Sequence, residues 1–421
     1  MNAPDERALQ QSRLGSKGLI AFLIFGNMFI PLSTDIYLPS LPAIGVSFRA
    51  STPLVNLTLT TFFFFYAVGI MLWGPLSDRY GRRPFLICGS ALYALASVGC
   101  AFSHSIGMLI VARMLQGMGT GAITTLTVAI IKDCYRARER ETILGLIYTL
   151  GGLAPMVAPL LGAQLLRLGD WRLAFYMLAL FGCLDFLLCL LYEETLRAEE
   201  RYCGRLAGAY GRLWAVVQNR SFFYPALLFA LPSLAYMGYV SISSFIYIRY
   251  FGLSAQVYSY YFALNASLAI LAPMIYLKWF RDRNKQKLGY GYALGTLLAG
   301  LLLFVAGRGA PWAFFLCFLP YALLSGSVRT FSVNWILEQH QGDSGASSSV
   351  LSASSTILNC LGMFVAAVYP GNIVSGLVIL MMLSGAVLLV GWRVFLRSSI
   401  PCVGVKTAPK QDSSQLGYAS E

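Results

Sequence analysis

The sequence predicts an all-α polytopic membrane protein with twelve transmembrane helices, and three observations support this fold class. Hydrophobic residues make up 57% of the 421 residues and charged residues only 12%, about half of the roughly 25% usual in soluble proteins. The apolar residues form runs of membrane length, and twelve spans of ~20 residues need about 240 residues, which matches the apolar share. Basic residues lie in short clusters between these runs, as the positive-inside rule expects.

The apolar runs place the individual spans along the chain. They lie at residues 18–43, 55–76, 84–104, 106–130, 142–166, 171–192, 222–246, 256–279, 288–307, 310–335, 345–368 and 372–396. The first run is longer than one crossing needs, and we expect Pro39 and Pro42 to bend its outer end.

The order of the apolar runs divides the chain into five parts. These are a cytoplasmic N-terminal tail (1–17), an N-terminal six-helix half (18–192), a cytoplasmic central loop (193–221), a C-terminal six-helix half (222–396) and a cytoplasmic C-terminal tail (397–421). The central loop is rich in Arg, Glu and Gly, which favours a surface helix plus a linker. We expect no cleavable signal peptide, because the polar start leads into a run that is too long.

The distribution of charge predicts the orientation. With the N-terminus inside, 24 Lys and Arg residues fall on the inside and five on the outside. This bias predicts cytoplasmic termini in a multi-pass protein of the bacterial inner (cytoplasmic) membrane. The net charge of +13 follows from these clusters, so no nucleic-acid partner is expected. The nine cysteines show no metal-ligand spacing, and we expect no metal or other cofactor.

A charged segment from Gly74 to Pro84 joins the second and third spans. Gly74, Pro75 and Gly81 are expected to supply the turn geometry. The segment resembles the hairpin between helices 2 and 3 of the major facilitator superfamily, whose pattern is G-x-L-[AS]-D-R-x-G-R-[RK]-x. The matching residues are Gly74, Leu76, Asp78, Arg79, Gly81, Arg82 and Arg83. The resemblance implies a transporter of two pseudo-symmetric six-helix halves, whose hairpin braces the halves and gates the cytoplasmic side without binding cargo.

Asp35 is the first ionisable residue inside a span, in the sequence Pro-Leu-Ser-Thr-Asp-Ile-Tyr-Leu-Pro-Ser-Leu-Pro. Ionisable groups within a membrane are costly and usually functional, and an apolar wall disfavours the charged carboxylate, which suits proton exchange. The alternative is a cap at a kink near the outer surface. The run resembles the first helix of the Bcr/CflA subfamily of drug:proton antiporters, which implies that Asp35 takes part in proton coupling or cargo binding.

Arg113 is the second such residue, in Arg-Met-Leu-Gln-Gly-Met-Gly. Arginine stays charged when buried, so it needs a partner, and Asp35 is the expected counter-ion. The segment is similar to the fourth-helix motif R-x-x-Q-G-x-G of the superfamily, matched at Arg113, Gln116, Gly117 and Gly119. The resemblance implies that Arg113 faces the central cavity and acts in proton coupling. A purely structural anchor is the alternative.

The fifth span carries Pro155 and Pro159 among Gly and Ala residues, which predicts a kinked helix with a smooth packing face. It resembles the antiporter motif G-x(n)-G-P-x-x-G-G at Pro159 and Gly162, while Ala158 and Ala163 replace two glycines. This partial match favours export over uptake, and generic helix packing is the alternative.

Weaker candidates complete the set. Asp185 is expected to extend to the inner interface, and Arg329 to pair with Glu338 or to face a cavity. Candidate cargo contacts combine aromatic and amide groups, which suit lipophilic cargo. They are Tyr37, Tyr236, Tyr239, Asn265, Asn334, Trp335 and Asn359. We also expect Asp78 to dock at the start of the eleventh span, with an arginine of the hairpin meeting Glu338 or Asp343, in the outward-facing state.

These features predict a proton-coupled exporter of drug-like or lipophilic molecules that works by alternating access. Its partners would be small-molecule cargo, protons and the lipid bilayer, and it would be a monomer, as the family usually is. The alternatives are a proton-coupled exporter or importer of a specific metabolite, such as an amino acid or siderophore, and a channel or sensor. An enzyme is not expected, because the sequence has no HExxH motif, His-rich face or phosphate loop.

Overall fold

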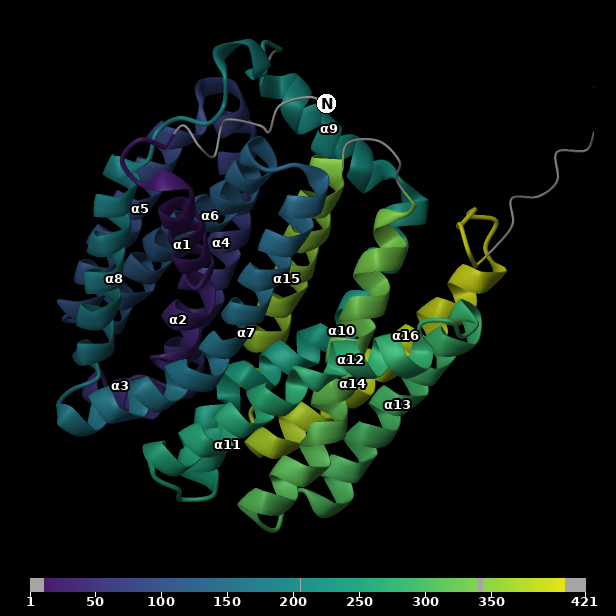
Figure 1. Ribbon diagram of the computed structural model, residues 1–421. Coiled ribbons are helices and arrows are strands. Elements are labelled where there is room, and N and C mark those ends of the chain that lie inside the picture. The colour runs from purple at the N-terminus through teal and green to yellow at the C-terminus, as the bar shows by residue number, and fades with distance from the viewer. Residues whose placement is uncertain (1–10, 205, 340–343, 406–421) are drawn as a thin grey trace, which may run out of the picture.

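In the computed structural model we describe residues 11–204, 206–339 and 344–405, which form helices joined by short connections (Figure 1). Twelve helical segments are long and apolar enough to cross a membrane, and each coincides with a predicted run. The prediction of an all-helical chain with twelve spans is therefore confirmed. His340, Asp343 and most of both predicted tails lie outside the described residues.

Six spans precede the central loop. The first combines α1 (Gly15–Asn27), α2 (Phe29–Asp35), a 3-10 turn η1 (Leu38–Ser40) and α3 (Leu41–Ser47). The others are α4 (Thr52–Tyr80), α5 (Arg82–Ala101), α6 (Ile106–Cys134), α7 (Ala137–Leu168) and α8 (Arg172–Leu191). A single 3-10 turn η2 (Ala198–Glu200) and α9 (Leu206–Gln218) then form the expected linker and surface helix.

Six spans follow α9. They are α10 (Arg220–Ser244) with a π-helical turn η3 (Phe245–Tyr250); α11 (Ala255–Ala269) with α12 (Leu271–Ile275) and a second π-helical turn η4 (Tyr276–Phe280); α13 (Lys285–Ala306); α14 (Pro311–Leu337); α15 (Ser344–Val368); and α16 (Ile373–Arg397). The first and last six spans meet mainly where α4 packs against α15 and α7 packs against α11.

The charged hairpin turns at a single residue. α4 continues through Gly74 and Pro75 to Tyr80, and only Gly81 leaves the helix, with a φ of 101° that favours glycine. The prediction that Gly74 and Pro75 form the turn is therefore wrong, because the helix extends beyond the apolar run. We call the end of the bundle that carries Gly81 the hairpin end, and the other the opposite end; α9 lies at the hairpin end, at the top of Figure 1.

The first span is broken rather than gently bent. The helix is interrupted at Met28 and again after Asp35, and the second break leads into the 3-10 turn that contains Pro39. A bend was expected near Pro39, but the break begins earlier. It places Asp35 at the last helical position of α2.

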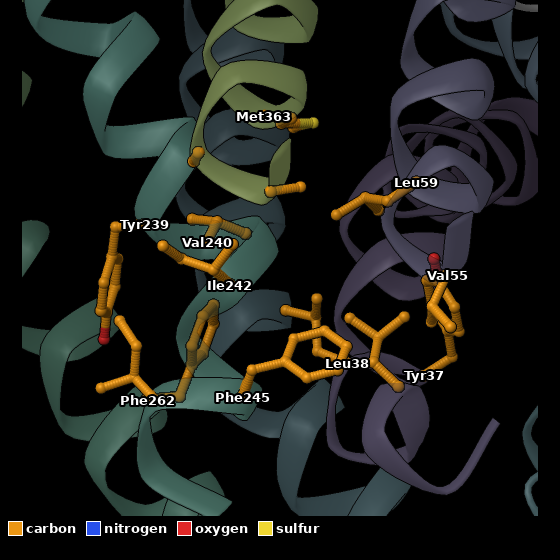
Figure 2. Close-up of a cluster of buried hydrophobic side chains, with 14 of the residues drawn as sticks. Tyr37, Leu38, Val55, Leu59, Tyr239, Val240, Ile242, Phe245, Phe262 and Met363 are labelled. Carbon is orange, nitrogen blue, oxygen red and sulfur yellow. The ribbon is translucent and has the colours of Figure 1, made fainter. Parts of the chain in front are cut away.

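The largest cluster of buried apolar side chains joins the two sets of spans near the opposite end. Figure 2 shows Tyr37, Leu38, Val55 and Leu59 from the first two spans facing Val240, Ile242 and Phe245. These apolar contacts seal the bundle at the opposite end.

Candidate functional site

A network of buried polar groups surrounds Arg113, the eighth residue of α6. The Arg113 side chain is fully buried. Its Nη1 donates to the Ser33 carbonyl oxygen at 3.0 Å and to Gln116 Oε1, and its Nε donates to the Thr58 carbonyl oxygen at 3.4 Å. Gln116 in turn donates to Ser97 Oγ at 2.8 Å. The network therefore joins α2, α4, α5 and α6 around one cation.

Aromatic rings complete the surroundings of the Arg113 guanidinium. Its Cζ lies 4.2 Å from the ring centroid of Phe62 and 4.6 Å from that of Tyr37. The Tyr37 hydroxyl shares a 2.8 Å hydrogen bond with Thr58 Oγ1, which fixes its ring. Ring faces attract cations, and the attraction is stronger where water is excluded. Among the described residues, neutral groups rather than a carboxylate hold the Arg113 charge.

Asp35 lies near this network but does not join it as an ion pair. Its side chain is only 6% exposed and accepts a hydrogen bond from Thr34 Oγ1 at 2.9 Å. The expected pairing of Asp35 with Arg113 is therefore wrong for this conformation: Arg113 Nε and Nη1 donate to backbone carbonyls and Gln116, and Nη2 is buried without a hydrogen-bond partner among the described residues.

The hairpin residues bind their own half of the molecule. Arg82 pairs with Asp78 and with Asp133, the latter at 2.9 Å between Nε and Oδ2. The backbone N–H groups of Arg82 and Arg83 each donate to the Glu194 carboxylate at 3.0 Å. Glu194 thus caps the start of α5, where unpaired N–H groups favour an anion.

The central loop also holds the hairpin. The Tyr202 N–H donates to the Asp78 carbonyl oxygen at 2.9 Å, and Arg79 Nη1 donates to the Gly204 carbonyl oxygen at 3.4 Å. The expected docking of Asp78 on the start of α15 is not seen here, since Asp78 pairs with Arg82 instead. The Asp343 part of that expectation lies outside the described residues.

The fifth span, α7, contains Pro155 and Pro159 within one continuous helix. A Cβ atom on Gly162 would lie 1.8 Å from the Ile36 carbonyl oxygen, so only glycine allows α7 to approach the break in the first span. Ser259 Oγ of α11 lies 2.9 Å from the Pro159 carbonyl oxygen. This helix therefore contacts both the residue after Asp35 and the second half of the chain.

Hydrogen bonds close the opposite end across the two halves. Arg249, in η3, donates from Nη2 to the Pro42 carbonyl oxygen at 3.2 Å and from Nη1 to Thr52 Oγ1 at 3.5 Å. Gln256 Nε2 donates to the Ala163 carbonyl oxygen at 3.3 Å. We call the two contacts of Arg249 the Arg249 bridge.

The hairpin end is hollow where the opposite end is closed. A cavity of about 440 Å³ separates the two halves there. Its residues from the first half include Asn27, Ile30, Tyr66, Ile70, Asp78, Arg82, Thr124, Thr125, Val128, Lys132 and Asp133. Its residues from the second half include Arg329, Gly345, Ala346, Ser348, Ser349 and Ser352. Bundles with this asymmetry give access to a central site from one side at a time.

Several cavity residues were missed from the sequence. Asn27 was the clearest signal, because it is an amide within an apolar run. Thr124, Val128 and Lys132 recur every four residues on α6, which places them on one helix face.

The predicted cargo residues lie elsewhere. Tyr37, Tyr239 and Asn265 are buried near the opposite end or within the second half, and Tyr236 is partly buried against Phe318, with ring centroids 6.3 Å apart. Asn359 Oδ1 accepts from Ser233 Oγ at 2.8 Å within the second half.

The remaining two cargo candidates lie near the hairpin end of α14. The buried Trp335 donates to the Val403 carbonyl oxygen at 2.9 Å, and Asn334 donates to the Thr330 carbonyl oxygen at 3.2 Å. None of the seven candidates lines the cavity in this conformation.

Of two other intramembrane expectations, the one for Asp185 is wrong, and of the two alternatives for Arg329 the structure shows the cavity. Asp185 is fully buried, with Oδ2 2.6 Å from Ser90 Oγ on α5, and does not extend to the interface, because a hydroxyl partner lies on the neighbouring helix. Glu338 pairs with Lys285 at 3.5 Å, whereas Arg329 faces the cavity.

Comparison with known proteins shows which protein family shares this architecture. The sequence profile described as Major Facilitator Superfamily matches residues 23–367. YdgK of Bacillus subtilis, an uncharacterized MFS-type transporter, is 35% identical over 237 residues, or 55% of this chain and 59% of that protein. A chloramphenicol resistance protein of Pseudomonas aeruginosa is 36% identical over 155 residues, 37% of each chain. A bicyclomycin resistance protein homolog of Haemophilus influenzae is 31% identical over 181 residues, 43% of this chain and 46% of that protein. Each match thus covers less than two thirds of the relative.

Solved structures share the fold over nearly the whole chain. A bacterial homolog of the human lysosomal transporter Spinster, in an inward-facing and unoccupied conformation, has a TM-score of 0.72 at 16% identity, covering 90% of this chain and 98% of that one. A D-xylose–proton symporter has a TM-score of 0.68 at 15% identity, covering 92% of this chain and 98% of that one. At such identity the likeness shows the fold alone. With the profile match over most of its length, the chain belongs to the Major Facilitator Superfamily of multi-pass secondary transporters and is not an enzyme.

Proposed function

We propose that the protein is a proton-coupled exporter of drug-like or lipophilic molecules, of the Bcr/CflA type, in a bacterial inner membrane. The observation that carries the proposal is Asp35, a buried carboxyl group at a break in the first span, with no ion-pair partner among the described residues. The drug-resistance names of the partial relatives support the cargo class.

Most Lys and Arg residues outside the spans lie at the hairpin end, so the positive-inside rule assigns this end to the cytoplasm. The conformation is then inward-facing, with the cavity open to the cytoplasm and the opposite end sealed. Ile30 lines the cavity and Asp35 lies five residues further along the first span, roughly 7 Å by helical rise. Asp35 is thus separated from the cavity by little more than one helical turn, and holding its charge there without a cation would be costly. It would carry a proton in this state.

Alternating access would then couple the two fluxes. Asp35 would gain a proton when the opposite end opens, and would lose it to the cytoplasm when cargo and water enter from the cavity. Arg113 would stabilise the ionised carboxylate of Asp35 when the polar network around Arg113 rearranges. The present partners of Arg113 are neutral groups, which a carboxylate displaces readily. The docking of Asp78 on α15 would close the hairpin end in the outward-facing state.

The test uses purified protein in proteoliposomes with an imposed pH gradient and an internal pH-sensitive dye. We expect chloramphenicol, bicyclomycin or a related drug to drive proton movement, and Asp35→Asn to reduce it to the rate of protein-free liposomes. Asp282→Asn, at an exposed carboxylate of the hairpin end, is the matched control and should keep the wild-type rate. Cargo-driven proton flux that persists in Asp35→Asn would contradict the proposal.

A further inference from the structure

The cavity at the hairpin end carries one cation from each half. Lys132 extends from the end of α6, and Arg329 lies on α14, eight residues before that helix ends. Both side chains are exposed to the cavity, and neither forms an ion pair with a described residue. The charge of Arg329 is unusual because it lies well inside a span, where an unpaired cation is costly.

The carboxylates of the same cavity are already engaged. Asp78 and Asp133 both bind Arg82, whose own side chain is almost buried between them. Arg82 therefore competes with Lys132 and Arg329 for both carboxylates. An anion supplied from outside the protein would complete the cavity.

The deeper wall defines the rest of such a ligand. Ile30, Ile70 and Val128 present apolar surface, while Tyr66 and Thr124 add polar groups. The volume of about 440 Å³ is in the range of pockets that enclose drug-sized molecules. An apolar body with one negatively charged group matches both the wall and the cations.

We propose that this cavity binds lipophilic organic anions, with Arg329 as the main contact for the carboxylate, sulfonate or phosphate group and Lys132 as the second. This inference rests on the proposed transport function and adds lipophilic anions to its cargo class.

The position of the two cations also links binding to conformation. Closing the hairpin end brings α6 and α14 together, and with them two like charges that repel. An anion bound between them removes this repulsion. A ligand shifts an equilibrium by its differential affinity for the two states, so anionic cargo would favour closure where a neutral analogue would not.

The test compares 1-naphthoate with 1-naphthamide, which share an apolar body and differ in charge. Binding is measured by isothermal titration calorimetry at pH 7 in an uncharged detergent, so the result does not depend on transport. We expect wild type to prefer the carboxylate, and Arg329→Gln to reduce that preference by roughly five- to tenfold. Arg329→Lys should retain most of it, which separates a role of charge from a folding defect.

A second basic hollow at the same end supplies the control. It is lined by Arg281, Arg283 and Lys285 and lies outside the cavity between the halves. Arg283→Gln should leave the preference unchanged. Equal affinity for the two compounds in wild type, an unchanged preference in Arg329→Gln, or loss of the preference in Arg283→Gln would each overturn the inference. If the anion binds but drives no proton flux, the result supports the anion site and contradicts the proton-coupled function. If cargo drives proton flux but binding shows no preference for the anion, the result supports the proton-coupled function and contradicts the anion site.

Discussion

Asp185 is the second carboxyl group buried within a span, and its surroundings differ from those of Asp35. The Ser90 hydroxyl has one hydrogen but lies 2.6 Å from Asp185 Oδ2 and 2.9 Å from the Leu86 carbonyl oxygen. Both contacts are satisfied if Asp185 is protonated and donates to Ser90, while Ser90 donates to Leu86. Asp185 then acts as a neutral packing group between α5 and α8.

This difference gives a prediction that separates the two acids. Asp185→Asn keeps a donor at the same place, so we expect near wild-type stability and near wild-type cargo-driven proton flux. Asp185→Ala loses the contact and leaves a cavity, and should lower the free energy of unfolding by about 1–3 kcal/mol. Denaturant unfolding in detergent measures the stability, and the proteoliposome assay measures the cargo-driven proton flux. Loss of proton flux in Asp185→Asn would give this residue a part in coupling.

At the scale of single residues, the sequence predicted the identity of the important residues better than it predicted their contacts. The arginine of α6 and the carboxyl of α2 are both buried together with polar groups, as two charges in apolar runs predicted. Gln116, three residues after Arg113 in the same motif, is one partner of the guanidinium. The other partners were not predictable, because they are backbone carbonyls and ring faces whose positions depend on the packing of α2 and α4. Composition and spacing carry no signal for such partners.

Among the elements, α7 depends most on a single small residue. Gly162 faces the Ile36 carbonyl oxygen. A Cβ on Gly162 would meet backbone atoms of Ile36, which cannot yield by a change of rotamer. By contrast, a Cβ on Gly152 of the same helix would meet nothing within 4 Å.

We therefore expect Gly162→Ala to force α7 away from the break in the first span. The cost of such overpacking is about 1–3 kcal/mol, and thermal unfolding in detergent should show a lower transition temperature. Gly152→Ala is the matched control, and should be neutral or slightly stabilising because alanine favours a helix. If both variants unfolded at the wild-type temperature, the close approach of α7 to Ile36 would not limit stability.

The limits of the helices show why some features escape prediction. Hydropathy located all twelve spans, since the bilayer thickness sets the length of each apolar run. It could not show that α4 continues to Tyr80, because the last turns of that helix lie beyond the apolar run and are held by the central loop. Gly74 and Pro75 are common turn residues, yet tertiary contacts keep them helical here.

For the whole molecule, the main feature is the contrast between a sealed opposite end and a hollow hairpin end. The Arg249 bridge joins the halves at the sealed end, and its acceptors are a carbonyl and a hydroxyl rather than a carboxylate. Neutral acceptors bind less strongly than charged ones. The seal therefore opens at a smaller cost than an ion pair would impose.

We expect Arg249→Ala to shift the molecule toward opening at this end. Backbone amide hydrogen exchange, followed by mass spectrometry, should become several-fold faster in Leu41–Ser47 and Phe245–Tyr250, because local opening exposes amides in proportion to its population. Arg308→Ala is the control, since Arg308 donates to Ser375 within its own half at the same end. Unchanged exchange in Arg249→Ala would show that the apolar contacts alone hold the seal.

The capping of α5 by Glu194 has a consequence for biosynthesis. Arg82 and Glu194 are 112 positions apart, yet both residues precede α9 in the chain, as do Tyr202 and Gly204. At 5–20 residues per second, the remaining half takes roughly 10–40 s to leave the ribosome. The contacts of Glu194, Tyr202 and Gly204 with the hairpin can thus form at the hairpin end before the second half of the chain is made.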